Sequence, residues 1–161
     1  MWKPLEKNAY RAIFSADSRA LLEITVFEVG VDDWQRLLDH LAARFLLIYS
    51  EDGVQTPLPK FEIIRQRRNQ ATLLMEVMLP GFTINCQFSD DGQIQMDLLP
   101  EDVNSSEKAE AVFQFMLAIA RLLNKRTFLV PEYASADSQR LCEMAICMAD
   151  PENSSVFSRS T

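Results

Sequence analysis

The sequence lacks the residue patterns that usually identify an enzyme. Its 161 residues include only four glycines and one histidine, with no glycine-rich phosphate loop and no cluster of metal ligands. The histidine, His40, lies off the apolar stripe of a predicted helix, and no residue is spaced to act as its catalytic partner. We therefore interpret it as part of a solvated helix face. The sequence predicts no cofactor and no metal, and it favours a non-enzymatic protein.

Basic residues are also in deficit. Lys and Arg total 16 against 23 Asp and Glu, which gives a formal net charge of -7. Nucleic acid and anionic membrane both require basic surface, so the charge disfavours them as partners. A basic protein partner is compatible with this charge, although acidity is also common among ordinary soluble proteins.

Cysteines are few, and long apolar runs are missing. The three cysteines, Cys86, Cys142 and Cys147, form no CxxC pattern, which favours a reducing compartment. A disulfide between Cys142 and Cys147 stays an open alternative. No apolar run reaches the length of a membrane span. Met1-Trp2-Lys3-Pro4 leads into charged residues without the apolar region of a signal peptide, so we expect a cytoplasmic protein.

The clearest pattern that is present predicts an antiparallel meander across residues 61–100. Apolar and polar residues alternate along 73–79, 82–88 and 94–98. Such alternation places one set of side chains on a core face and the other toward water. The segment Phe61 to Gln66 is predicted to add one more strand.

The turns of this meander predict its register. Pro80-Gly81 suits a two-residue turn, and Asp90-Asp91-Gly92 suits a three-residue turn with Gly92 in the left-handed conformation. With these loop lengths, apolar residues of one strand oppose apolar residues of the next. The predicted pairs are Leu79 with Phe82, Val77 with Ile84, Phe88 with Ile94, and Cys86 with Met96.

The rest of the chain predicts two main helices and further strands. Apolar stripes with helical spacing run from Trp34 to Phe45 and from Ala109 to Leu123. Residues 137–149 fit either a helix or a strand, and residues 151–161 are predicted to be a polar, flexible tail. We therefore predict one domain over 1–150 with an α+β fold, in which an antiparallel sheet carries both helices on one face.

Three polar residues of the meander form the first candidate site. The register places Glu76 opposite Asn85 and Asn85 opposite Asp97, in one row across three strands. Because neighbouring strands lie about 4.8 Å apart, the two carboxylates are expected roughly 10 Å apart. We interpret the row as a polar recognition patch. A widely spaced acid–base pair of a hydrolase and a plain solvated sheet face remain the alternatives.

Acidic loop pairs extend this candidate surface. Asp90-Asp91 and Glu101-Asp102 each suit a turn or a helix cap, and together they could steer a basic partner. The candidate partner-binding residues are therefore Glu76, Asn85, Asp97, Asp90, Asp91, Glu101 and Asp102.

A family resemblance extends over residues 30–135. It is carried by the motifs Trp34-x-x-Leu37-Leu38, Ile84-Asn85-Cys86-x-Phe88, Met96-Asp97-Leu98-x-Pro100-Glu101, Phe115-Met116, Leu123-x-Lys125 and Leu129-Val130-Pro131-Glu132. In these motifs the chain resembles small bacterial α+β proteins that are encoded near polymorphic toxins and suspected to be immunity proteins. The resemblance implies a cytoplasmic protein that binds and occludes a cognate toxin, without shared catalytic residues. A dimeric, acidic secretion chaperone for an effector and a hydrolase that uses Glu76 and Asp97 are the alternatives.

Overall fold

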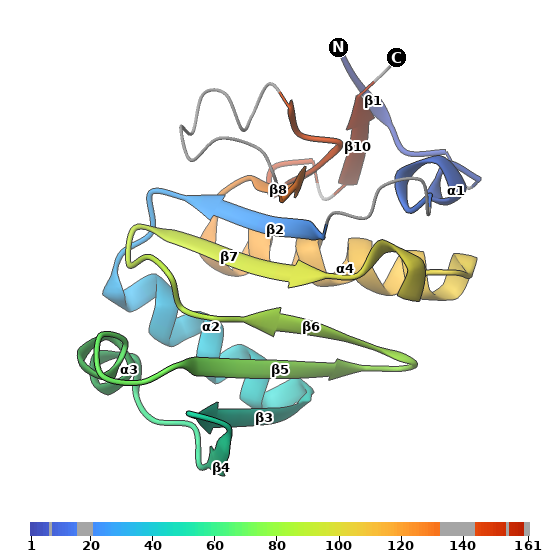
Figure 1. Ribbon diagram of the computed structural model, residues 1–161. Helices are drawn as coiled ribbons and strands as arrows, with labels where there is room; N and C mark the ends of the chain where they lie inside the picture. Colours follow the sequence, from blue (N-terminus) through green and yellow to red (C-terminus); the bar gives the residue numbers. More distant parts are fainter. Residues whose placement is uncertain (7, 16–20, 133–143, 154, 160–161) are drawn as a thin grey trace.

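A sheet whose central strands bury every second side chain organises this protein. The computed structural model describes residues 1–6, 8–15, 21–132, 144–153 and 155–159 (Figure 1). The helices of this part are α1 (Tyr10–Ile13), α2 (Val31–Arg44), α3 (Phe61–Arg67), the 3-10 helix η1 (Pro100–Asp102) and α4 (Ser106–Leu123). The strands are β1 (Trp2–Pro4), β2 (Leu22–Phe27), β3 (Leu46–Glu51), β4 (Val54–Thr56), β5 (Leu73–Leu79), β6 (Phe82–Cys86), β7 (Gln93–Leu98), β8 (Thr127–Pro131), β9 (Cys147–Asp150) and β10 (Ser155–Arg159).

The strands form one antiparallel sheet with the order β1-β10-β9-β8-β2-β7-β6-β5-β3-β4. Helices α2 and α4 cover one face and lie behind the sheet in Figure 1. The viewer looks onto the other face, which we call the open face because no described helix covers it. The predicted α+β fold, an antiparallel sheet with helices packed on it, is confirmed. None of the described helices is long and apolar enough to cross a membrane.

The main core lies between the sheet and the two long helices. Along β5 every second residue is buried, and the predicted apolar stripes of α2 and α4 are buried against this side of the sheet. Each fully buried aliphatic side chain contributes about 1.5–3 kcal/mol relative to an exposed one. A smaller cluster lies on the open-face side of β8 and β9 and contains Phe128, Val130, Ala145 and Met148.

The meander of β5, β6 and β7 keeps most of its predicted register. Leu79 pairs with Phe82, Val77 with Ile84, and Cys86 with Met96. Gly81 has φ +84°, as the third position of the Pro80-Gly81 turn requires.

The connection between β6 and β7 differs from the prediction. Strand β6 ends at Cys86, and Phe88 adopts a left-handed φ of +56°, while Gly92 does not. The Phe88 ring is buried, with its centroid 5.6 Å from that of Trp34 and 6.3 Å from that of Tyr49. The predicted Phe88–Ile94 pair and left-handed Gly92 are therefore wrong. Strand β6 therefore ends before Phe88, and the Phe88 ring packs beside Trp34 and Tyr49.

Three other segments also correct the sequence prediction. Residues predicted as a strand from Phe61 form helix α3, in which Phe61 and Ile64 are buried at helical spacing. Of the ambiguous stretch 137–149, residues 147–149 belong to strand β9, while 137–143, including Cys142, lie outside the described residues. Cys147 is a buried free thiol. Ser155–Arg159 form β10 between β9 and β1, so the prediction of a flexible tail is wrong for these residues.

Candidate functional site

Four polar residues lie in one row across the open face. Glu76 of β5 pairs with Asn85 of β6, Asn85 pairs with Asp97 of β7, and Asp97 pairs with Glu23 of β2. We call these residues the carboxylate row. The three predicted members are thus brought together as expected. All four are partly buried.

Burial and like charge disfavour the ionised forms of two members. The pKa of Glu23 is raised, first by burial and then by the nearby charges of Asp97 and Glu132. The pKa of Asp97 is also raised by burial and by Glu132, although a side-chain hydrogen bond from Asn85 opposes the change. Glu132 lies just after β8, where its carboxylate accepts a hydrogen bond from the Leu21 backbone N–H at 3.1 Å. This end of the row therefore concentrates negative charge that lacks a compensating cation among the described ion pairs.

The remaining polar atoms of the row favour a hydrogen-bond donor as ligand. The Asn85 Oδ1 atom is buried and has no partner among the described residues. A hollow beside Asp97, lined by Glu23, Gln87, Ser89 and Gln95, has a volume of about 30 Å³. That is roughly the share of a single water molecule in the liquid. No three His, Cys, Asp or Glu side chains of the described residues are grouped so that they could hold a metal ion.

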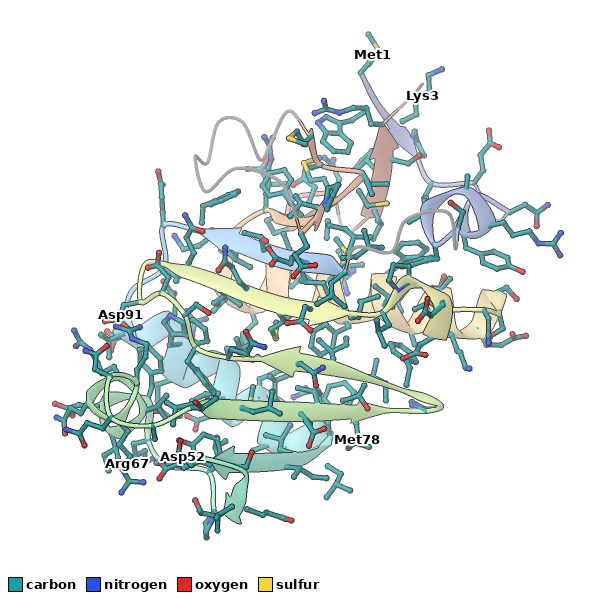
Figure 2. The ribbon with its side chains drawn as sticks, in the orientation of Figure 1. Met1, Lys3, Asp52, Arg67, Met78 and Asp91 are labelled. Carbon is teal, nitrogen blue, oxygen red and sulfur yellow. The ribbon has the colours of Figure 1, made fainter. Side chains whose placement is uncertain are left out.

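An apolar patch adjoins the carboxylate row. On the open face, Leu46 opposes Met78 and Ile48 opposes Glu76. Leu74 lies two positions before Glu76 on β5, so its side chain is on the same face. We call Leu46, Ile48, Leu74 and Met78 the apolar patch, and Figure 2 labels Met78 within it. Leu46 is 69% exposed, and the other three are partly exposed. Grouped apolar side chains on an uncovered sheet face are typical of an interaction surface.

The predicted acidic loop at Asp90-Asp91 makes contacts within the protein. The Asp91 carboxylate contacts Arg65 at 3.2 Å and Arg68 at 2.7 Å. Asp90 Oδ1 accepts a hydrogen bond from the Gly92 backbone N–H at 2.7 Å, which shapes the turn. The Asp91 charge is therefore neutralised by two arginines from α3 and its C-terminal end.

A second acidic loop holds α3 in the same way. Glu51 accepts a hydrogen bond from Arg67 at 2.7 Å and another from the Tyr49 hydroxyl at 2.9 Å. Asp52 Oδ1 accepts from the Thr72 backbone N–H at 2.8 Å. Figure 2 shows Asp52, Arg67 and Asp91 around this end of the sheet. Both acidic loops therefore attach α3 to the sheet.

Glu101 and Asp102 lie apart from the other loop acids. They belong to η1, which follows the C-terminal end of β7, whereas Asp90 and Asp91 precede its N-terminal end. Glu101 is exposed and Asp102 is partly exposed. The structure therefore does not join the predicted loop acids into one surface.

Several residues of this surface are not evident from the sequence. Glu23 joins the row because β2 pairs with β7 across about 70 intervening residues, and no local pattern predicts that pairing. Leu46 and Ile48 join the patch through the pairing of β3 with β5. The one local signal is the apolar character of Leu74 and Met78 on the outer face of a strand.

Comparisons with protein-family models, curated proteins and solved structures give no match for this chain. The geometry of the open face is therefore the main guide to its function.

Proposed function

We propose that this chain is a non-enzymatic binding protein whose open face binds a basic protein partner. The observation that carries the proposal is the carboxylate row, which lies beside the apolar patch on an uncovered sheet face. Burial and like charge disfavour the ionised forms of these carboxyl groups. A Lys or Arg side chain from a partner would therefore stabilise them more than it would stabilise an exposed, isolated carboxylate. The adjoining apolar side chains would exclude water around such a contact.

The partner that we propose is a folded toxin of the kind that immunity proteins inhibit. A chain with a net charge of -7 attracts a basic protein over a distance and speeds their encounter. The toxin would be inhibited because the open face covers its active site. The acidic loops would contribute less to binding this partner than the sequence suggests, because the carboxylates of Asp91 and Glu51 are already paired with arginines.

The two alternative functions receive less support. A secretion chaperone that adds an extended segment to a sheet edge needs an edge of some length, and the edge strands β1 and β4 have three residues each. A hydrolase that uses Glu76 and Asp97 needs room for its substrate. The hollow beside Asp97, at about 30 Å³, has room for one water molecule. A larger hollow of about 560 Å³ adjoins it at Gln87 and Ser89, but neither Glu76 nor Asp97 lines that space.

A capture experiment with matched charge reversals tests the proposal. The wild type, Glu76→Lys on the open face and Glu110→Lys on the exposed side of α4 are tagged and used to capture partners from native lysate. We expect the wild type and Glu110→Lys to retain one basic protein in stoichiometric amount, and salt to release it. Glu76→Lys should lose that protein. Equal retention by Glu76→Lys, or a captured partner that is acidic, would contradict the proposal.

A further inference from the structure

A separate apolar cavity lies on the helix side of the sheet, away from the open face. It is bounded by the C-terminal half of α2, the middle of α4 and the turn between β5 and β6. Its volume is about 240 Å³. Sites for drug-sized ligands usually measure about 300–1,000 Å³, so this cavity suits a smaller molecule. Its apolar walls are Leu41, Phe45, Leu79, Pro80, Phe115 and Ile119.

Two alanines of α4 leave this space open. Ala111 and Ala118 are separated by seven residues, so they lie on the same side of the helix, and both line the cavity. Because their side chains are single methyl groups, α4 does not fill the space against the end of α2. Phe115 lies between them on α4, its ring centroid is 5.7 Å from that of Phe45, and both rings line the cavity.

The rim of the cavity carries a cation and an imidazole. Arg44 and His40 are one helical turn apart on α2, and Arg44 Nη1 lies 3.0 Å from His40 Nδ1. Burial and the adjacent Arg44 charge lower the pKa of His40, so its ring is neutral at neutral pH. A neutral ring that accepts from Arg44 at Nδ1 carries its own proton on Nε2 and can donate it. Among the described residues, no carboxylate lines the cavity and none forms a salt bridge with Arg44.

We propose that this cavity binds a small amphiphilic carboxylate, such as a medium-chain fatty acid. The hydrocarbon chain would lie in the apolar cavity, and the carboxylate would accept hydrogen bonds from Arg44 and His40 at the rim. An anionic head group complements an arginine that has no described carboxylate partner, and a small apolar cavity complements a single hydrocarbon chain. This site is independent of the partner that we propose for the open face.

Titration calorimetry of the full chain with octanoate and with 1-octanol tests the head-group contacts. We expect octanoate to bind more tightly than octanol, because only octanoate has a charged head for Arg44. Arg44→Gln should remove this preference and leave octanol binding unchanged. Arg121→Gln, which changes an exposed arginine of α4, should behave like the wild type. Equal affinities for octanoate and octanol in the wild type would overturn the proposal.

Two further tests concern the apolar cavity: the chain length of the fatty acid is varied, and the cavity is filled by a larger side chain. Each methylene removed from the fatty acid should weaken binding about fourfold, as about 0.8 kcal/mol per buried methylene implies. Ala118→Leu should abolish binding of both ligands, and its thermal unfolding would show that the variant is folded. Failure of octanoate to bind the wild type at millimolar concentration, or undiminished binding by folded Ala118→Leu, would also overturn the proposal.

Discussion

Trp34 of α2 contacts both α3 and the connection between β6 and β7. Its replacement tests how much these contacts stabilise the fold. Its ring is buried and stacks on Phe61 at 4.8 Å with an interplanar angle of 7°. Its Nε1–H donates to the backbone oxygen of Asp91 at 3.0 Å. Trp34→Phe keeps a ring at this position but removes the donor, so the Asp91 carbonyl loses a partner.

The expected loss of stability combines two contributions. The lost hydrogen bond is worth about 1 kcal/mol, with a further cost if the carbonyl stays unpaired. The smaller ring buries roughly 40 Å² less apolar surface, which at about 25 cal/mol per Å² adds about 1 kcal/mol, before any cavity cost. We therefore expect a loss of about 2–3 kcal/mol. For a chain of this size, that corresponds to a fall of about 4–12 °C in melting temperature.

Urea unfolding followed by circular dichroism measures this loss without relying on tryptophan fluorescence. Trp2→Phe is the matched control, because Trp2 lies partly exposed on edge strand β1, where its ring packs under the Arg159 guanidinium at 5.1 Å. We expect the control to lose less than about 1 kcal/mol. A Trp34→Phe variant as stable as the wild type, or equal losses in the two variants, would refute the reasoning.

Three further predictions concern charge, a turn and helix α3. Because the pKa of Asp97 is raised in the folded protein, its ionisation costs stability as the pH rises above the ordinary value of 3.8. In urea unfolding, the stability of Asp97→Asn relative to the wild type should therefore increase as the pH rises above 3.8. A stability difference that does not change with pH would argue against this. Gly81→Ala should lose about 1–2 kcal/mol in the same assay, because φ is +84° there. Gly30→Ala, with φ -109° and no atom within 4 Å of the added carbon, should lose less, and equal losses would count against strain at the turn. Arg68→Ala should speed amide hydrogen exchange in α3, whereas Arg121→Ala should not; unchanged exchange in α3 would show that the arginine contacts are not needed there.

Local alternation was sufficient to predict the centre of the sheet. The pairing of Glu76 with Asn85 follows from strand period and the short Pro80-Gly81 turn, which act over a few residues. Asn85 pairs with Asp97 as predicted, although the connection between their strands differs from the predicted turn. Glu23 and Leu46 could not be placed in this way, because their strands reach the meander through long-range pairings. The predicted row of three residues is therefore confirmed as an arrangement on the sheet, and its neighbours Glu23 and Leu46 were not predicted.

Tertiary contacts override local preference where the prediction was wrong. In α3, Phe61 and Ile64 are buried together, and the Phe61 backbone N–H donates to Gln35 Oε1 of α2 at 2.8 Å. The arginines at its end pair with acids from two distant loops. Gln35 and the two loop acids lie well outside α3 in the sequence. The short apolar run from Phe61, read by itself, therefore indicated a strand. The internal ion pairs of the loop acids were likewise not evident from the sequence.

The role of the open face is tested most directly by the affinity of the purified partner for two truncated variants. Leu46→Ala removes an exposed side chain from the apolar patch, and Val54→Ala removes one from edge strand β4, where Val54 is 65% exposed. If a partner buries Leu46, its truncation should cost about 2 kcal/mol, or roughly thirtyfold in affinity. The account predicts this loss for Leu46→Ala and nearly unchanged affinity for Val54→Ala. Equal affinity of the wild type and Leu46→Ala would contradict it.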